Sequence, residues 1–417
     1  MGKKGLVCVS CIILVLASVL TVSGAIMPSA SFGGVASAGL PGDYPEDKYM
    51  VPTGKARDHV FIFALIGAFS KMRGLEVWDG ASIQSESLSI YDVNGKLLFY
   101  EFSVVKGGKI VGTVKASASM VLGTSVYSMQ PGIRSYNPDK TRDEALKIAK
   151  AKYPTQQVIE TLLVCYSYPK IGIMVRLSDP KTKLETTIIV DAADYKLVPP
   201  GDDKYDGLGY WSLYSKIPDA TRKQRIEDYR KLDNLIVSVI KEAKVDTEGR
   251  LDEPIFIIIA ITPESKSLNN FNLHGQETND YCAVATGQMI LEYRGYVYTQ
   301  AQIAPAMDHH PSGCTNEGQV QGYESLSGGA LDATYDTTAN WSEAKAEIDA
   351  GRPLKSGIYR HARACAGYSS WWPFLRSWIF IYDPWGQTDS AQALPHEGAT
   401  YWENWDDITH TNWIYVR

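Results

Sequence analysis

The sequence QETNDYCAVAT at residues 276–286 sets a single cysteine, Cys282, at the start of an apolar run. From Cys282 to Tyr293 the apolar residues recur with helical spacing, and Asn279 or Asp280 is a suitable cap for the start of the helix. Cys282 is therefore expected in the first turn of a helix. Unpaired backbone N–H groups and the positive end of the helix dipole stabilise a thiolate there, so this cysteine is a candidate nucleophile.

Two further motifs supply partners for a thiolate. His361 opens an apolar strand and follows a turn and strand with the sequence GRPLKSGI at 351–358. Asp383 ends the strand WIFIYD at 378–383 and is followed by Pro-Trp-Gly. An imidazole can take the proton of a thiol, and a carboxylate can orient the imidazole. The order Cys, His, Asp is therefore consistent with a nucleophilic enzyme.

The order and setting of these motifs resemble papain-like peptidases of the bacteriocin-processing, C39-like type, over about residues 265–417. The resemblance implies an α+β fold with two lobes, one of helices and one of antiparallel strands. It implies that Cys282 is the nucleophile, His361 the base and Asp383 the group that orients His361. Gln276, six residues before Cys282, would stabilise the oxyanion together with the backbone N–H of the cysteine. Neither a cofactor nor a metal is expected.

The sequence departs from the family pattern at two positions. Ala283 follows the cysteine and Arg360 precedes His361, where Gly is commoner in the family. We expect Ala283 to restrict the backbone next to the nucleophile. Arg360 is expected to place a fixed charge at the cleft, with consequences for substrate preference.

Three residues beside the motifs are candidate substrate contacts: Trp385, Tyr281 and His274. Trp385 is also expected to cover the hydrogen bond between His361 and Asp383 and to keep water away from it. For His274, which lies close to the oxyanion glutamine in sequence, a position in a solvated loop is the alternative.

Asp308, His309, His310 and Cys314 lie close together in the sequence and raise the question of a zinc site. Two adjacent histidines point in different directions on regular structure, and no second cysteine pair accompanies them. An exposed loop at the rim of the cleft is the favoured interpretation.

The remaining cysteines do not make a disulfide framework. Two of the six, Cys8 and Cys11, lie in the N-terminal apolar segment, which leaves too few for such a scaffold in a chain of this length. Cys165 and Cys365 are expected in the core. A bridge between Cys314 and Cys365 stays open at this point.

Residues 1–25 are predicted to be a signal peptide, with Lys3 and Lys4 before an apolar run at 7–22 and small residues at 23–25. An uncleaved anchor is the alternative. Residues 26–43 are small and polar and are expected to form a flexible leader. The formal net charge of −6 and the lack of a basic cluster give no reason to expect nucleic acid as a partner. A secreted or cell-surface protein with no membrane contact after signal removal is predicted.

Residues 44–200 are predicted to form a separate α+β region. A helix at 56–72, a hairpin at Asn94-Gly95 and strands at 97–105, 109–116 and 120–128 are expected. A capping box, Thr141 with Glu144, predicts a helix ending at Tyr153, and strands follow at 157–167, 170–177 and 185–192.

The helix and three strands at 140–200 resemble small PepSY-type modules, and the whole of 44–200 resembles, more loosely, propeptides of secreted papain-like enzymes. The resemblance implies that this region blocks the cleft until the chain is cut between about 200 and 270. Residues 201–264 are expected to connect the two parts through an amphipathic helix and a buried strand at 255–259.

These observations predict a secreted cysteine endopeptidase that is made as a zymogen and acts on polypeptides. A transglutaminase-type acyl transferase uses the same three groups and is one alternative. A catalytically silent surface binding module of papain-like shape is the other, although Gln276, Cys282, His361 and Asp383 are all intact.

Overall fold

The computed structural model of the chain describes residues 47–70, 72–200, 209–252, 262–338, 340–372, 376–386 and 396–417. The predicted signal peptide, the leader and the strand predicted at 255–259 lie outside these residues. Within the described ranges, no helix combines the length and the apolar character that a membrane span requires.

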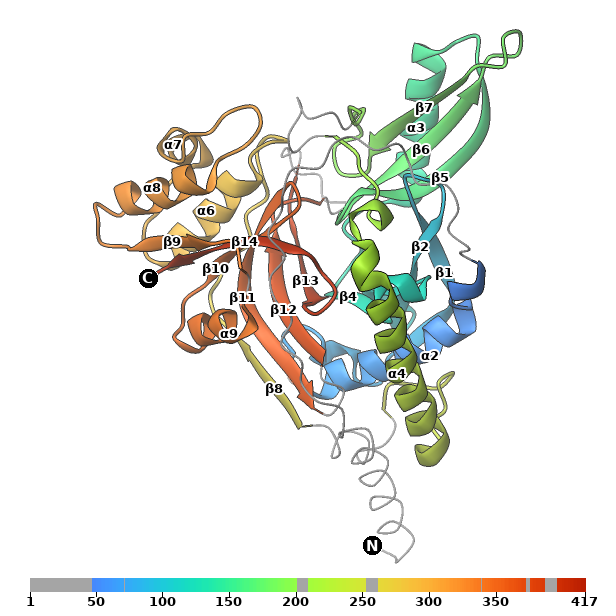
Figure 1. The fold of residues 1–417 in the computed structure, drawn as a ribbon, viewed down its shortest axis with the longest axis horizontal. Helices are drawn as coiled ribbons and strands as arrows, with labels where there is room; N and C mark the ends of the chain where they lie inside the picture. The colour runs from blue at the N-terminus through green and yellow to red at the C-terminus, as the bar shows by residue number, and fades with distance from the viewer. Residues whose placement is uncertain are drawn as a thin grey trace, which may run out of the picture.

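The N-terminal part is built from helices and a group of strands (Figure 1). Its elements are η1 (Asp47–Tyr49), α2 (Thr53–Phe69), η2 (Glu76–Trp78), β1 (Ser82–Asp92), β2 (Leu97–Lys106), β3 (Lys109–Ser117), η3 (Met120–Leu122), β4 (Val126–Pro131), α3 (Pro138–Lys152), β5 (Gln157–Ser167), β6 (Lys170–Ser178) and β7 (Glu185–Asp191).

The rest of the chain begins with a long helix and continues into a group of helices followed by strands. Its elements are η4 (Tyr214–Lys216), α4 (Asp219–Ala243), β8 (Thr262–Ser267), α6 (Cys282–Tyr293), α7 (Gln300–Ala306), α8 (Asn316–Leu326), β9 (Ala333–Asp336), α9 (Trp341–Asp349), β10 (Leu354–Ile358), β11 (His361–Trp372), β12 (Arg376–Asp383), β13 (Ala399–Asn404) and β14 (His410–Val416). In Figure 1, α6, α7 and α8 lie together on one side of β10–β14.

Strands of both parts join in one mixed sheet with the order β7-β6-β5-β1-β2-β3-β4-β13-β12-β11-β10-β14-β9, and β8 pairs with β11 beside this path. The two parts meet where β4 pairs with β13, with Met129 opposite Trp402 and Ser128 opposite Glu403. β1 and β5 are parallel neighbours, and the other pairs are antiparallel. The expectation of an α+β fold is therefore confirmed.

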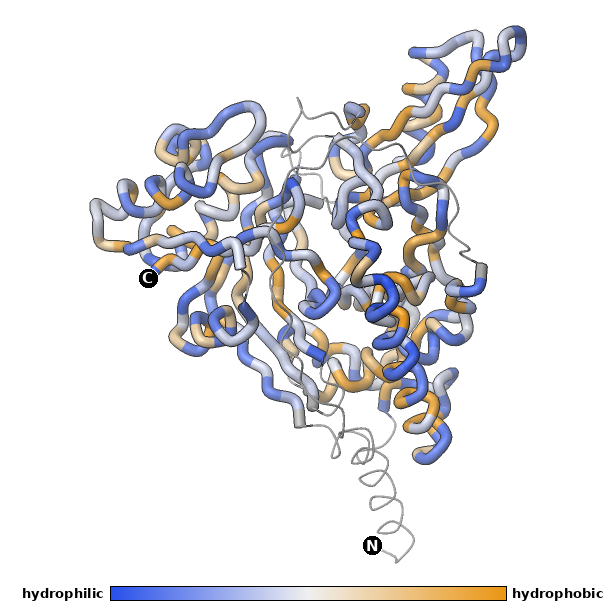
Figure 2. Tube along the Cα trace, in the orientation of Figure 1, coloured by the Kyte–Doolittle hydropathy of each residue, from blue (hydrophilic) through white to orange (hydrophobic). Residues whose placement is uncertain are grey.

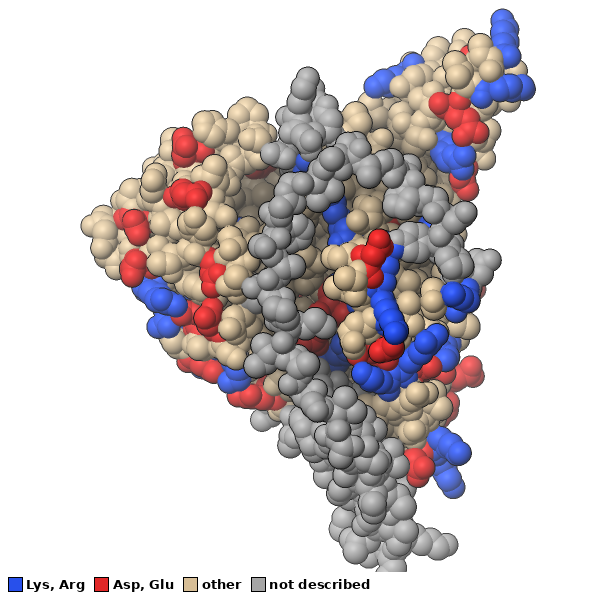
Figure 3. Space-filling view, viewed as in Figure 1, with Lys and Arg blue, Asp and Glu red and all other residues tan. Residues whose placement is uncertain are grey.

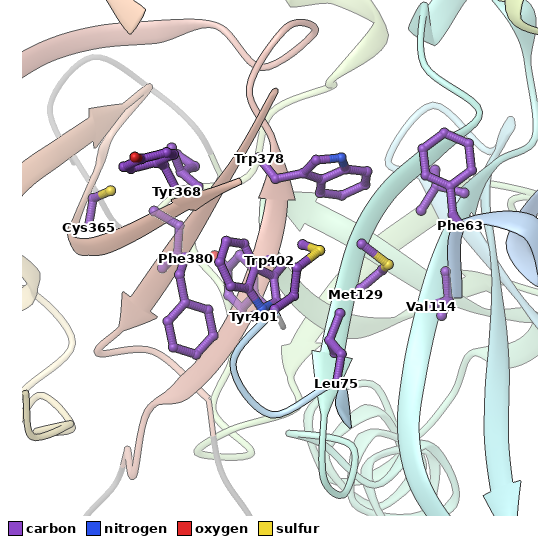
Figure 4. Packing of buried hydrophobic residues seen from close by; sticks show 14 of the residues in the cluster. Phe63, Leu75, Val114, Met129, Cys365, Tyr368, Trp378, Phe380, Tyr401 and Trp402 are labelled. Atoms are coloured by element: carbon purple, nitrogen blue, oxygen red, sulfur yellow. The ribbon is translucent and has the colours of Figure 1, made fainter. Parts of the chain in front are cut away.

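The two parts also share a hydrophobic core. Phe63 of α2 lies 5.4 Å from Trp371 and 5.8 Å from Trp378, measured between ring centroids. Met129 of β4 and Trp402 of β13 belong to the same cluster, and Figure 4 shows these side chains between strands of the two parts. The N-terminal part therefore contributes side chains to the core of the C-terminal part, and the two parts do not have separate cores.

Helix α4 lies across the surface of the molecule. Its tube alternates between hydrophilic and hydrophobic residues in Figure 2, as the predicted amphipathic helix requires. Lys, Arg, Asp and Glu side chains lie side by side in this region of the surface (Figure 3). The helix contains the ion pairs Arg222–Asp219 and Lys231–Asp228. Such exposed pairs contribute little to stability, so the buried face of α4 fixes its position.

Two sequence predictions are wrong in detail. The helix predicted from Thr141 begins at Pro138, because the Asn137 side chain accepts from the backbone N–H of Lys140 and Pro is well suited to the first turn. The strand predicted at 120–128 is instead the turn η3 followed by β4, since Gly123 adopts a φ of 88° that ends the turn.

The other predicted elements of this region are present. The helix predicted at 56–72 corresponds to α2, and the turn at Asn94-Gly95 joins β1 to β2. Helix α3 is followed by β5, β6 and β7 as the 140–200 pattern requires. The resemblance of this unit to PepSY modules stays a prediction.

Replacing Phe63 by Ala tests the shared core. The change removes a fully buried ring and is expected to lower the free energy of unfolding by about 3–5 kcal/mol, as for other buried Phe→Ala changes. Because both parts share this cluster, tryptophan fluorescence is expected to follow one denaturant transition, shifted as a whole. Val237→Ala, at an exposed site on α4, is the control. Two separate transitions, with only one shifted, would contradict a shared core.

Candidate active site

Helix α6 begins at Cys282, as the sequence predicts, and Cys282 is half-buried. The N-cap position is Tyr281 and no side chain caps the helix, so the expected cap by Asn279 or Asp280 is wrong. The carboxylate of Asp280 contacts Thr278 and His309, and the Asn279 amide donates to Asp194. Backbone N–H groups at the helix start therefore lack a side-chain cap next to the sulfur.

His361 starts β11, where it follows the tight turn from β10. It is buried, and its Nε2 lies 2.7 Å from Oδ1 of Asp383. Its Nδ1 is buried too and has no hydrogen-bond partner of ordinary length among the described residues. The structure therefore joins one ring nitrogen to a carboxylate and leaves the other available.

Asp383 ends β12 and is held by more than the imidazole. The backbone N–H of Trp385 donates to its Oδ1 at 2.9 Å, and the Tyr401 hydroxyl donates to its Oδ2 at 2.8 Å. Burial raises the pKa of this carboxyl, but the charge of His361 and the hydrogen bonds outweigh burial and lower it. Asp383 is thus an ionised, fixed acceptor. Sequence reasoning missed Tyr401, because only the pairing of β12 with β13 brings it to Asp383.

Cys282 and His361 line the same cleft, whose volume is about 480 Å³. The lining also includes Lys170 from the N-terminal part, Lys355 of β10 and Arg360 of the β10–β11 turn. Residues far apart in the sequence therefore converge around the thiol.

The thiol and the imidazole influence each other's ionisation. Burial raises the pKa of Cys282, but interaction with His361 and the charge of Lys170 outweigh burial and lower this pKa to about 7. For His361, burial lowers the pKa, but the charge of Asp383 and the interaction with Cys282 raise it above its ordinary value. The cleft therefore favours a thiolate–imidazolium pair near neutral pH.

Residues 268–412 match the model of the Peptidase_C39 like family. This segment is similar to the peptidases of that family. The match agrees with the resemblance to C39-like cysteine peptidases that the sequence motifs indicate. None of the curated proteins compared with the chain matches it.

Among solved structures, the crystal structure of UfSP from C. elegans shares 16% sequence identity with this chain. The overlap covers 37% of this chain and 34% of that chain, with a TM-score of 0.27. This chain thus spans about a third of the length of that protein, and the similarity carries no conclusion about activity.

Gln276 of the C39-like domain is fully buried, and its backbone N–H donates to the Pro384 carbonyl at 3.1 Å. This contact holds the loop before Cys282 against the loop after Asp383. One N–H of the side-chain amide donates to the carbonyl oxygen of Thr278 at 2.6 Å. An amide nitrogen carries two hydrogens, so a second donor remains. The role of Gln276 at the oxyanion stays a prediction.

The three expected substrate contacts of the C39-like domain do not line the cleft. The Trp385 ring packs 4.0 Å from that of His396, between ring centroids, and the Lys170 ammonium lies 3.7 Å from its centre. Tyr281 packs edge-on against His309 at 4.7 Å. His274 contacts Glu292 of α6 through a hydrogen bond. A substrate role for Trp385, Tyr281 and His274 stays a prediction.

Arg360, the departure from the family pattern before His361, has a φ of 57°. This left-handed backbone explains why a Gly is favourable at that position. Its guanidinium lies over the Tyr359 ring at the cleft, as expected for a fixed charge at this position. Ala283 is buried at the helix start.

The other described cysteines, Cys165, Cys314 and Cys365, are free thiols. Cys165 and Cys365 are buried, as expected, and burial raises the pKa of Cys314 and of Cys365 to about 12. In the described part of the chain, no three His, Cys, Asp or Glu side chains are grouped so that they could hold a metal ion. His309 pairs instead with Asp280.

Lys170 is the main residue of the cleft that sequence reasoning missed. It starts β6, directly after the turn at Tyr168 and Pro169, and it is 3% exposed although it carries a charge. Nothing in its local sequence distinguishes it from a surface lysine. Only the fold brings this turn to Cys282.

The pKa values predict how Cys282 reacts with iodoacetamide. The rate follows the thiolate fraction, so it is expected to rise with pH to half its maximum near pH 7, well below the usual cysteine value of about 8.5. Peptide mapping after short exposures measures it. Cys314, with a pKa of about 12, is the internal control. His361→Ala is expected to move the midpoint upward. A wild-type midpoint at 8.5 or above would contradict the thiolate–imidazolium pair.

Proposed function

We propose that the chain is a secreted cysteine endopeptidase, made as a zymogen, that hydrolyses peptide bonds through Cys282, His361 and Asp383. The observation that carries the proposal is the buried imidazole at 2.7 Å from a carboxylate, in one cleft with a thiol whose pKa is about 7. Ion pairs with a purely structural role also perturb pKa values. Here, however, the perturbed thiol shares a cleft with an imidazole, and that imidazole is hydrogen-bonded to a carboxylate, as nucleophilic catalysis requires.

The reaction follows from this arrangement. The Cys282 thiolate attacks the scissile carbonyl carbon, and the carbonyl oxygen becomes an oxyanion. The His361 imidazolium gives its proton to the leaving amine, and the C–N bond breaks to leave a thioester on sulfur. A water molecule, deprotonated by neutral His361, then attacks the thioester and releases the acid. Asp383 keeps the imidazole oriented and stabilises its charged form.

Donors for the oxyanion lie at the start of α6. The backbone N–H of Cys282 belongs to the first turn, which has no side-chain cap. The free N–H of the Gln276 amide is the second donor in the proposal. Removing one such donor typically lowers turnover about 100- to 1000-fold.

Contacts from the N-terminal part support its role as an intramolecular inhibitor. Lys170 enters the cleft beside Cys282, and Asp194, which follows β7, accepts a hydrogen bond from Asn279 at 2.8 Å. The Tyr168 hydroxyl in the same turn donates to Glu403 of β13 at 2.8 Å. Lys170 and Asn279 line the same cleft as Cys282, so their contacts fill part of the space next to the thiol.

The shared core affects how the N-terminal part could be released from the cleft. A cut between residues 200 and 270 would leave β4 paired with β13 and Phe63 packed on Trp371 and Trp378. We therefore propose that activation depends on the turn before Lys170. After the connection is cut, this turn must move Lys170 away from the cleft. Export and the signal at residues 1–25 remain part of the proposal.

Mass spectrometry of the purified chain beside Cys282→Ala tests the function. Self-cleavage products that the variant lacks would support a peptidase. Adding a peptide substrate with a primary amine separates hydrolysis from acyl transfer, because a transglutaminase-type enzyme would give amine adducts. If both proteins stay intact and neither cleaves or modifies peptides, the proposed function is wrong.

A further inference from the structure

Lys355 is a buried cation that the proposed reaction does not use. It lies on β10, lines the cleft that holds Cys282, and is 3% exposed. Its ammonium group contacts the side-chain oxygen of Asn412 on β14. The charge of Cys282 is the largest influence that raises the pKa of Lys355, and no carboxylate of the described residues contributes to it. A buried ammonium without a paired carboxylate is costly, so it can gain from a ligand that brings one.

The absence of a side chain at Gly357 leaves the space that the Lys355 ammonium occupies. A side chain at Gly357 would place its Cβ 2.4 Å from the Asn412 amide oxygen and 2.8 Å from Lys355 Nζ. Opposite these residues on β11 stand Ala362 and Ala364, both with small side chains. The small residues Gly357, Ala362 and Ala364 therefore leave space for the contact between the Lys355 ammonium and the Asn412 amide oxygen.

The cleft is cationic although the chain as a whole has a net charge of −6. Its lining contains Lys170, Lys355 and Arg360, and Asp280 is the acidic residue that lines it. Asp280 is already engaged by His309, whose Nε2 lies 3.3 Å from its Oδ2. When Lys170 leaves with the N-terminal turn, Lys355 and Arg360 stay with the C39-like domain.

We propose that Lys355 binds a carboxylate of the substrate, so that the enzyme prefers peptides with an acidic group close to the scissile bond. The inference rests on the proposed peptidase function and adds its substrate class. An ammonium–carboxylate contact inside a cleft is a charge-assisted hydrogen bond, which is stronger than a neutral one. Asn412 keeps the ammonium in place by accepting one of its three protons.

Lys355 also interacts with the thiolate, since the charge of Cys282 raises the pKa of the lysine, but Lys355 is not among the main causes that lower the pKa of Cys282. His361 and Lys170 are the side chains that most lower the pKa of Cys282. Burial lowers the pKa of Lys355 itself to about 8, so the lysine stays mostly charged at neutral pH, and a bound carboxylate would stabilise that charge.

Alkylation with two small reagents tests the carboxylate site without any peptidase activity. Iodoacetate carries a carboxylate and iodoacetamide does not, and both attack the same thiolate. The ratio of their rates at Cys282 is expected to fall about tenfold in Lys355→Met, because one charge-assisted contact is lost. Lys231→Met on the exposed face of α4 is the control and is expected to leave the ratio unchanged.

Thermal melts establish that the variants are folded, and Lys355→Gln, which keeps a polar group for Asn412, takes the place of the Met variant if that one does not fold. An unchanged ratio in a folded variant overturns the carboxylate site. Slow alkylation of wild-type Cys282 with both reagents would instead overturn the peptidase proposal, so the two failures are distinguishable.

Digestion of peptide pools by the full chain identifies the source of the carboxylate. Enrichment of Asp or Glu at one fixed position, lost in Lys355→Met, supports recognition of an acidic side chain. Cleavage that requires a free rather than an amidated C-terminus supports recognition of a terminal carboxylate by the same lysine. Cleavage with neither preference, or with a preference that Lys355→Met retains, overturns the inference.

Discussion

Replacing Asp383 by Ala is expected to lower peptide turnover roughly 100- to 10,000-fold, the range over which an acid–base partner contributes. The carboxylate is the hydrogen-bond partner of His361 Nε2 at 2.7 Å, and it is fixed by Tyr401 and Trp385. Without it the imidazole loses both its orientation and the charge that favours its protonated form. Steady-state kinetics on a fluorogenic peptide measures the effect.

Asp383→Asn separates orientation from charge. The amide oxygen can still accept from His361, so turnover is expected to fall less than in the Ala variant. The carboxylate charge raises the pKa of His361, and Asn removes that charge. Because the reactive pair needs imidazolium, the alkaline limb of the pH–rate profile is expected to move to lower pH, while the acidic limb near pH 7 reports Cys282.

Tyr401→Phe is the matched comparison for both variants. It removes one hydroxyl that donates to Asp383 and leaves the carboxylate in place, so a smaller loss of turnover is expected. A fully active Asp383→Ala protein, or an alkaline limb that does not move in Asp383→Asn, would show that this carboxylate does not support the imidazole.

Replacing Lys170 by Ala is expected to raise peptide turnover by the full chain by up to roughly 30-fold. Its ammonium lies 3.7 Å from the centre of the Trp385 ring, and a desolvated cation–π contact contributes about 2 kcal/mol. Losing that contact shifts the balance toward chains in which the turn has left the cleft. The same change removes a positive charge that lowers the pKa of Cys282, so the alkylation midpoint is expected to rise.

Lys170→Met tests whether the charge accounts for both effects, because it keeps the length of the side chain and removes only the charge. Both its alkylation midpoint and its turnover are expected to rise as in the Ala variant. Lys147→Ala, an exposed lysine of α3, is the control. If Lys170→Ala leaves both turnover and midpoint unchanged, Lys170 does not hold the cleft closed.

Local sequence signals predicted the elements that carry the proposed chemistry. Apolar spacing predicted α6 from Cys282 to Tyr293, and the apolar run before Asp383 predicted the end of β12. Such periodicity and its stop signals depend on neighbours along the chain, so a single sequence contains them. The pairing of His361 with Asp383 followed from the order of the motifs and is present at 2.7 Å.

The sequence could not reveal groups that reach the thiol through tertiary structure. Lys170, Lys355 and Tyr401 sit on strands whose local sequences give no sign of a site, and sheet pairing decides which faces they share. The N-cap of α6 was also out of reach, because contacts with Asp194 and His309 occupy the two side chains that local preference favoured. Such competition from tertiary contacts routinely overrides local preference.

Labelling of the full chain at pH 7 with an equimolar epoxide thiol probe, followed by peptide mapping, tests whether Cys282 is an activated nucleophile. We expect an adduct on Cys282 and little on Cys165, Cys314 or Cys365, with the labelling lost in His361→Ala. Labelling of Cys282 no faster than that of free cysteine, or labelling that persists without His361, would contradict this expectation.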